Sequence, residues 1–484
     1  MDTYTTKCRL YTWGANSYGQ LGQGNTEDLA DPQHTESSLL KGVICITGGG
    51  GHSALITDSG SLLVCGQNHK GQLGLGHTTG VLTFVPLSLS SPVQQVCCGW
   101  DSTLFLTDSG QVLSCGSNAF GQLGVSLQVP YSAEPLPVQS LHEPVISIAA
   151  GLRHALAVTC SGGVYQWGKG MHSQAKRCRH DTVLPSYLSS KEPCKVPGLD
   201  LVTSVKVAAG STHSACLTAG GDVFLWGSNK YGQLGHADSF LPLPVALDRS
   251  LFNGESVIHI HSGWTHLIAS TESGRVFTWG RACYGQLGRP VPANEGTDLG
   301  QDAAQTGSSL RPHSVPTEIS HLAGASQIAC GSEHNLAIKG DCLFSWGWNE
   351  HGMCGDGSLC DVMRPQPIPA LRAARPVLIG CGAGHSMALC CLKDREVEDC
   401  ATASAAQAEA AHVRLTSPST LQQDARWLPS ESSVFNRLRT GEGDLEDIGN
   451  AESIKCWISL VEDAEYTVML SGSLLCGRNE RETT

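Results

Sequence analysis

The segment YTWGANSYGQLG, residues 11–22, returns in related form down most of this 484-residue chain. Each copy joins a Trp-Gly or Cys-Gly pair to a turn that ends in Gly-Gln-Leu-Gly or in an eroded version of it. The seven copies place their aromatic or thiol residue at Trp13, Cys65, Cys115, Trp167, Trp226, Trp279 and Trp346, in steps of 50 to 67 residues. A period near fifty residues with strand-like segments indicates a β-propeller or a similar array.

A second motif, Gly-x-x-His followed by an apolar strand, precedes every copy except the first. It also occurs seven times, and the second occurrence carries Ser102 in place of His. In the first six occurrences the strand continues through a turn such as residues 107–110 into the Trp-Gly or Cys-Gly strand. Apolar residues alternate on both sides of that turn, so the unit is predicted to be a β-hairpin.

The two motifs are out of phase at the ends of the repeat region. The chain begins with a Trp-Gly strand that has no His strand before it, and the last His strand has no Trp-Gly strand after it. A closed ring explains both observations, because the strand around Trp13 completes the blade begun by residues 376–390. We therefore predict an all-β, seven-bladed propeller over residues 1–391, closed by its N-terminal strand, which protects the sheet edges.

Three segments depart from the period. Residues 169–185 replace a Gly-Gln-Leu-Gly turn with a locally basic stretch, and residues 289–314 form a long Gly/Pro/Ala-rich loop. Beyond residue 391 the period is lost, and residues 392–484 are expected to be a low-complexity, mostly disordered tail.

The regular residues of the repeat have a structural interpretation. Leu21, Leu73, Leu123, Leu234 and Leu287 are expected in the core between blades. One active site needs only one or two His residues, so six that recur in register are interpreted as structural hydrogen-bonding groups: His52, His154, His213, His266, His334 and His385.

Composition excludes several classes of function. The net charge is −13, whereas binding of nucleic-acid phosphates requires clustered Lys and Arg. The first residues lack a signal core, and no run of 18 apolar residues predicts a membrane span. The 21 Cys residues lie largely at strand positions and include no C-x-x-C pair, so free thiols in a reducing compartment and no metal site are expected. No motif for a cofactor occurs.

The two motifs together resemble the regulator of chromosome condensation repeat family over residues 1 to about 391. The resemblance implies a propeller that acts as a guanine nucleotide exchange factor, or another regulator, of a small GTPase in secretion. Such a factor forms no covalent bond, because it distorts the loops that hold the nucleotide. In the founding exchange factor of the family, the face that carries the Gly-x-x-His loops does this work, and acidic and His residues there matter.

Site candidates are the residues at which these loops depart from the repeat. Asp101 and Glu333 are the two acids directly before the His position, and the slot after Gly is acidic in no copy. Trp100 and Trp264 occupy that slot in the second and fifth copies, where an exposed Trp is a frequent interface anchor. Arg153 is a further candidate for pairing with an acidic partner loop. The alternatives are a turn cap for Asp101, fillers of the channel mouth for the Trp residues and a solvated surface side chain for Arg153.

The sequence leaves two functions open. The first is the small-GTPase regulator, with secretory-machinery partners, in the cytoplasm or also the nucleus, acting as a monomer. The second is a non-catalytic propeller scaffold for protein–protein interaction. A metabolic enzyme has no support, because the chain contains no P-loop, nucleophile elbow, metal-ligand spacing or Rossmann fingerprint.

Overall fold

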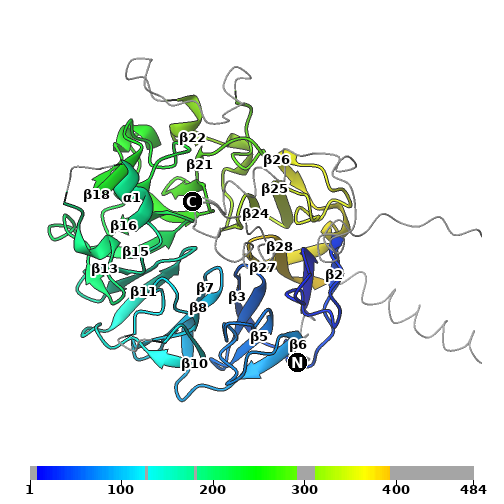
Figure 1. The fold of residues 1–484 in the computed structure, drawn as a ribbon. Helices are drawn as coiled ribbons and strands as arrows, with labels where there is room; N and C mark the ends of the chain where they lie inside the picture. Colours follow the sequence, from blue (N-terminus) through cyan, green and yellow to red (C-terminus); the bar gives the residue numbers. More distant parts are fainter. Residues whose placement is uncertain (1–7, 126–128, 179–182, 292–310, 393–484) are drawn as a thin grey trace, which may run out of the picture. The chain divides into compact units, whose positions relative to one another are not determined.

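The computed structural model describes residues 8–125, 129–178, 183–291 and 311–392. These residues form seven four-stranded antiparallel sheets arranged as the blades of a propeller (Figure 1). The predicted seven-bladed fold is confirmed. The tail predicted over residues 392–484 lies outside the described residues from 393 onward, as does most of the predicted 289–314 loop.

Each blade contributes one strand to each of four concentric positions (Figure 1). The innermost strands, which contact one another around the channel, are β3 (Val43–Gly48), β7 (Val93–Cys98), β11 (Val145–Ala150), β15 (Ser204–Ala209), β19 (Val257–Ser262), β23 (Gln327–Cys330) and β27 (Ala374–Cys381). The second strands are β4 (His52–Thr57), β8 (Ser102–Thr107), β12 (Ala155–Thr159), β16 (His213–Thr218), β20 (His266–Thr271), β24 (His334–Lys339) and β28 (His385–Leu392).

The third strands carry the Trp-Gly or Cys-Gly pairs. They are β5 (Leu62–Gly66), β9 (Val112–Ser117), β13 (Val164–Trp167), β17 (Val223–Ser228), β21 (Val276–Gly280), β25 (Cys342–Gly347) and β1 (Cys8–Gly14). The outer strands are β6 (Val81–Leu87), β10 (Tyr131–Pro137), β14 (Cys194–Lys195), β18 (Phe240–Ala246), β22 (Thr317–Glu318), β26 (Val362–Pro367) and β2 (Leu29–His34). Pro residues in or beside these outer strands remove N–H donors from the exposed edges, which discourages pairing with another chain.

The N-terminal strand closes the ring as predicted. Strand β1 pairs antiparallel with β28 from Cys8↔Cys391 to Gly14↔His385, so the seventh blade combines both ends of the repeat region. Cys8 and Cys391 form a disulfide across this pair, with Cα atoms 4.0 Å apart. All other cysteines among the described residues are free, so the prediction of free thiols fails at this one pair. A sequence separation of 383 residues hides it from local pattern analysis.

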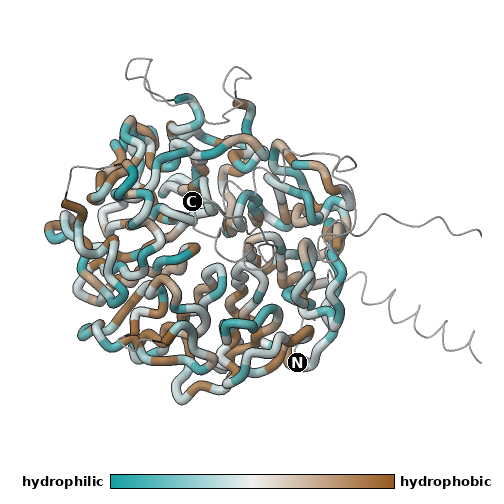
Figure 2. Tube along the Cα trace, in the orientation of Figure 1, coloured by the Kyte–Doolittle hydropathy of each residue, from teal (hydrophilic) through white to brown (hydrophobic). Residues whose placement is uncertain are grey.

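The core consists of seven apolar layers, one between each pair of neighbouring blades. Figure 2 shows the corresponding hydrophobic stretches along the strands. The five Leu residues of the Gly-Gln-Leu-Gly turns are at most 1% exposed, as expected. Gly19 and Gly22 of the first turn have φ of 78° and 68°, which explains why Gly recurs at both positions.

The Trp-Gly motif is a polar link between blades. The indole N–H of Trp279 donates to the backbone carbonyl of Gln233, in the Gly-Gln-Leu-Gly turn of the preceding blade, over 2.9 Å. Trp13, Trp167 and Trp346 make the equivalent bond, and the thiols of Cys65 and Cys115 make it at 3.5 and 3.4 Å. The Gln-Leu-Gly tract is therefore architecture, because its carbonyl receives the next blade.

The eroded fourth copy substitutes a different acceptor. Its turn is replaced by helix α1 (His172–Cys178), so the usual Gln carbonyl is missing. Trp226 donates instead to Oε1 of Gln166, at 2.8 Å. The basic stretch predicted over residues 169–185 thus contains α1 and the buried Met171 and Ala175, which pack into the layer between the third and fourth blades. Short 3-10 turns cover Ser186–Leu188, Arg249–Phe252, Pro312–Ser314, Ser320–Leu322 and Pro369–Leu371.

Candidate functional site

Seven loops between the innermost and second strands meet at one face of the propeller, which we call the His-loop face. They cover residues 49–51, 99–101, 151–154, 210–212, 263–265, 331–333 and 382–384. The turns that follow the Trp-Gly or Cys-Gly pairs lie on the same face, because in six copies the N–H after the pair donates back to a His loop, as from Arg281 to the carbonyl of Thr265 at 3.0 Å. In the fourth copy Gly170, one residue later, makes this bond to Arg153.

Backbone hydrogen bonds between the described residues join each of these loops to its neighbours, except loops 99–101 and 151–154, and so form a belt around most of the channel. The N–H of Trp264 donates to the carbonyl of Ser332 over 2.8 Å, and the N–H of Ser211 donates to the carbonyl of Trp264 over 3.0 Å. Further bonds of this kind run from Leu152 to Gly210, Ser332 to Ala383, Ala383 to Gly49 and Gly50 to Trp100. The belt fixes the backbone at the face and leaves the side chains in the variable slots to differ.

The six His residues also link blades. Nε2 of each ring lies 2.7 to 3.1 Å from a polar side-chain atom of the next blade. In five cases this atom belongs to the residue that directly follows the His (or Ser102) position of that next blade: Ser53, Thr103, Ser214, Asn335 and Ser386. His213 reaches Ser262 instead, at 3.0 Å, because Leu267 follows the next His. The structure thus places these His residues in inter-blade hydrogen bonds.

The Gly of the Gly-x-x-His motif makes room for the imidazole ring. A Cβ on Gly263 would lie 2.1 Å from Cε1 of His266, and the equivalent Gly residues are equally constrained. Burial lowers the pKa of His52, His213, His334 and His385 to about 3 and that of His154 to about 4, so these rings are neutral.

The second copy lacks the His, and the next blade lacks the polar side chain that this His would contact. Ser102 stands where His is expected, and the residue that would receive its bond in the next blade is Ala155, which has no polar atom on its side chain. Both members of the inter-blade pair are therefore absent together. The change leaves no buried polar group unpaired, so it is a structural accommodation rather than a sign of catalysis.

Trp100 and Trp264 meet across the channel. Their ring centroids are 5.3 Å apart at an interplanar angle of 58°. Because they belong to the second and fifth blades, which are not neighbours, this contact has to cross the propeller axis. A Cβ on Gly50 would lie 2.8 Å from the Trp100 ring, so the smallest residue in this slot makes room for one of the largest. Both rings remain partly exposed.

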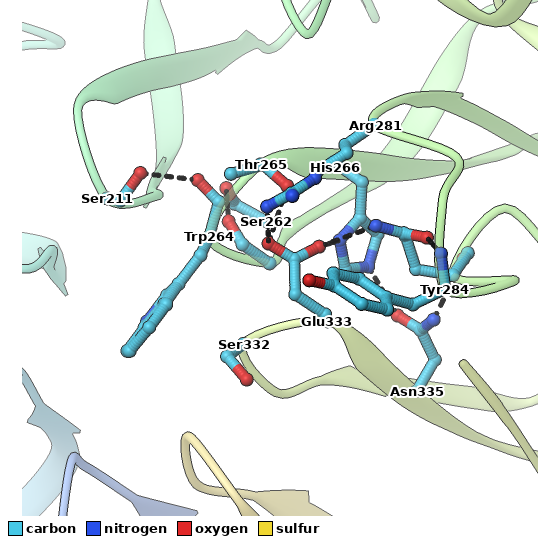
Figure 3. A network of polar contacts seen from close by, with 12 residues as sticks. Ser211, Ser262, Trp264, Thr265, His266, Arg281, Tyr284, Ser332, Glu333 and Asn335 are labelled. Atoms are coloured by element: carbon cyan, nitrogen blue, oxygen red, sulfur yellow. Dashed lines mark hydrogen bonds and ion pairs between the residues drawn. The ribbon is translucent and has the colours of Figure 1, made fainter. Parts of the chain in front are cut away.

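Glu333 lies at the centre of a buried polar network (Figure 3). It is 2% exposed, and its carboxylate accepts hydrogen bonds from Thr265 Oγ1 at 2.6 Å and Gln286 Nε2 at 2.8 Å. His266 Nδ1 and Arg281 Nη1 lie 3.7 and 4.0 Å from its oxygens.

The network contains charged groups. Burial by itself opposes ionisation of both partners, but it is outweighed. Contacts with Cys330 and Glu333 raise the pKa of His266, and contacts with His266 and Arg281 lower that of Glu333. His266 is thus the charged member of an otherwise neutral set.

Arg281 connects this network to an aromatic arc on the His-loop face. Its guanidinium carbon lies 4.6 Å from the ring centre of Tyr231 and 4.9 Å from that of Tyr284. The ring centroid of Tyr284 lies 6.3 Å from that of Trp348, and the ring centroid of Trp348 lies 5.9 Å from that of His351. The arc spans the turns of the fourth, fifth and sixth blades. Sequence reasoning missed it, although Arg281 and Trp348 both occupy the slot after Trp-Gly, where five other copies have Ala, Gln, Ser or Lys.

Asp101 and Arg153 occupy different environments. Asp101 is partly exposed, accepts a bond from Gln122 Nε2 at 3.4 Å and has its pKa raised by burial. Arg153 is 6% exposed, and its guanidinium carbon lies 4.1 Å from the ring centre of Phe120. Of the five candidates, the structure brings Trp100 and Trp264 together and leaves Asp101 accessible. Glu333 and Arg153 are buried, so direct partner contact requires them to move. Among the described residues, no group of three or more His, Cys, Asp or Glu is placed to hold a metal ion.

The repeat pattern and its position match a known domain over residues 9–388, described as the RCC1-like domain. The chain belongs to the RCC1-like domain family. It is 51% identical over 393 residues to the secretion-regulating guanine nucleotide exchange factor of Bos taurus, which covers 80% of this chain and 84% of the cattle protein. The resemblance inferred from the repeat motifs is therefore confirmed.

Solved structures of the RCC1-like fold agree with the architecture. Human WBSCR16 is 27% identical and superposes with a TM-score of 0.65 over 80% of this chain and 99% of its own. Prp20p of Saccharomyces cerevisiae, whose structure was described with its binding to Gsp1p and histones, is 21% identical, with a TM-score of 0.67 over 84% of this chain and 96% of its own. Among the described residues, no helix is long and apolar enough to cross a membrane.

Proposed function

We propose that this protein regulates a small GTPase through its His-loop face, as a guanine nucleotide exchange factor. The observation that carries the proposal is the 51% identity to a relative named for guanine nucleotide exchange, which extends through all seven blades. The secretory pathway, secretory-machinery partners, a monomeric state and a cytoplasmic or also nuclear location belong to the same proposal.

Exchange requires a rigid surface that holds an altered GTPase loop, because no bond is made or broken. The belt of backbone hydrogen bonds supplies the rigidity. The Trp100–Trp264 pair and the arc from Tyr231 to His351 supply aromatic area, which is the usual energetic centre of an interface. Asp101 is the accessible acid beside the Trp pair. Glu333 acts indirectly, by holding Arg281 between its two Tyr rings.

A second candidate is a non-catalytic scaffold. It is favoured by the absence of an acid in the slot after Gly in all seven loops, and by the burial of Glu333. The two functions differ in their dependence on nucleotide. An exchange factor binds the nucleotide-free GTPase more tightly than the loaded form, whereas a scaffold binds independently of the nucleotide state.

The test is release of a fluorescent GDP analogue from a panel of purified small GTPases, with and without the full-length protein. Each GTPase is first shown to respond to its own exchange factor. We expect acceleration for at least one GTPase and a loss of about tenfold in that acceleration for Asp101→Asn, which removes a charge at an interface. No acceleration anywhere in the panel would refute exchange, and equal binding of GDP-loaded and nucleotide-free GTPase would favour the scaffold.

A further inference from the structure

Six innermost strands carry a β-bulge near their start, at the second residue in five of them and at the fourth in β27. The register shifts leave Ile44, Gln94, Ile146, Val205, Ile258 and Val377 unpaired. Five of the six bulged residues are β-branched and apolar, with exposed fractions of 55%, 46%, 37%, 47% and 39% for Ile44, Ile146, Val205, Ile258 and Val377. Bulges re-aim side chains and commonly accompany functional sites.

The bulges that carry these five side chains lie on innermost strands, toward one end of the channel. Each innermost strand ends at a His loop and therefore begins at the opposite face, so the bulges lie toward that opposite end of the strands around the channel. Single exposed apolar residues are ordinary on protein surfaces, but five toward one end of the channel form a patch. We call Ile44, Ile146, Val205, Ile258 and Val377 the collar.

Basic and imidazole side chains follow two of the collar residues in sequence. Lys206 and His259 each come one residue after a bulge on the neighbouring strands β15 and β19, and His261 lies 6.3 Å from His259 between ring centroids. Burial lowers the pKa of the Lys206 ammonium, and the nearby Cys97 thiol opposes this shift. The described residues provide no hydrogen bond or ion pair for this ammonium, so it remains available to an anion.

The charges of the surrounding turns restrict which anion fits. Asp58, Asp108, Glu272 and Asp341 are exposed at the turns between the second and third strands, on the same face as the collar. These carboxylates repel a polyacidic segment more strongly than a segment with one carboxylate, so the turns favour an apolar segment that carries a single carboxylate. At the other end, the Trp100–Trp264 pair bridges the channel, so a ligand enters from the collar side.

We propose that the collar and Lys206 bind the C-terminal end of a partner protein, with apolar side chains against the collar and the free α-carboxylate at Lys206. Capture of a terminal carboxylate is an established mode of peptide recognition, and His259 and His261 offer additional N–H donors here. The site lies on the face opposite the His loops, so it is independent of the proposed GTPase surface and leaves that surface free.

The probe is a panel of N-terminally fluorescein-labelled heptapeptides that end in Val, Leu or Ile, each made with a free carboxylate and as the amide. Binding to the full-length protein is followed by fluorescence polarisation. We expect free-carboxylate peptides to bind, and amidation or Lys206→Met to weaken binding about tenfold or more, the effect of losing a charge-assisted hydrogen bond. Ile44→Asp with Ile258→Asp should abolish binding.

Matched controls separate the site from general surface effects. Lys191→Met and Leu201→Asp change an exposed Lys and a fully exposed apolar residue outside the collar and should leave binding unchanged. Circular dichroism melting confirms that each variant is folded. Equal binding of acid and amide peptides, no binding by any peptide, or loss of binding only in Trp100→Ala with Trp264→Ala would each overturn the proposal.

Discussion

Acidification should unfold this propeller through its His residues. Five of the six inter-blade rings have folded pKa values of about 3 to 4, whereas an unfolded His titrates near 6.5. The folded chain therefore keeps them neutral while the unfolded chain binds protons. The stability that they support is fully present above pH 6.5 and is lost as the pH falls toward the folded values.

The magnitude follows from linkage. Between pH 7.5 and 5.5 the free energy of unfolding falls by about 1.4 kcal/mol for each ring, and therefore by about 7 kcal/mol for five rings. This loss is comparable with the whole stability of a typical domain. Near pH 5.5, these five rings should take up between about four and five protons on unfolding. His261, whose pKa burial also lowers to about 3, should add about one more. His266 adds nothing to this uptake, because contacts with Cys330 and Glu333 raise its pKa and keep it charged in the folded chain.

Calorimetric unfolding in buffers of different ionisation enthalpy measures the proton uptake directly. His213→Gln should lower the uptake near pH 5.5 by about one proton, because one neutral ring is removed. Uptake of one proton or fewer by the unaltered protein would refute the conclusion that the rings are neutral and buried.

Three further predictions concern single contacts. Glu333→Gln should lower the pKa of His266, because it removes one of the two contacts, with Cys330 and Glu333, that raise this pKa. The stabilisation by charged His266 is present below pH 6.5 and is lost as the pH rises through its raised folded pKa. Calorimetry at pH 8 should therefore show fewer protons released on unfolding, by up to about one, than in the unaltered protein. Gly263→Ala should lower the free energy of unfolding, measured by chemical denaturation, by about 1–3 kcal/mol, because the added Cβ would lie 2.1 Å from Cε1 of His266. The control Gly220→Ala should be tolerated, because the atom nearest to its added Cβ is 3.5 Å away. Equal effects of the two substitutions would contradict the packing. Cys8→Ser, or excess reductant, should lower the free energy of unfolding by about 2–5 kcal/mol, because either one removes the disulfide between β1 and β28. Cys160→Ser, at an exposed free thiol, is the control. An unchanged melting temperature of the Cys8 variant would show that the disulfide does not support closure.

The fold was predictable because the repeat is periodic and its ends are out of phase. Trp13 without an upstream His strand and His385 without a downstream Trp strand are enough to require closure by the first strand. Trp100 and Trp264 were identifiable as departures from a small-residue slot, but their contact across the axis was not, because no pattern in the sequence reports which loops face each other.

Other features depend on pairs that lie in different blades. The polar residue that receives each His is in the next blade, so its identity matters only once neighbouring blades are in place. From the sequence alone, Glu333 is expected to be an exposed acid on a loop. The structure buries it because Thr265 and Gln286 of the preceding blade donate to its carboxylate. Arg281 escaped notice for the same reason, since its two Tyr rings come from two different turns.

The central claim is that the His-loop face acts on a small GTPase through the residues that depart from the repeat. The most direct measurement compares nucleotide release from the responding GTPase for the unaltered protein, for Trp100→Ala with Trp264→Ala, and for the collar variant Ile44→Asp with Ile258→Asp. Loss of two central aromatic anchors should reduce the acceleration at least tenfold, and the collar variant should retain it. Full acceleration by the Trp variant, or its loss in the collar variant alone, would contradict the account.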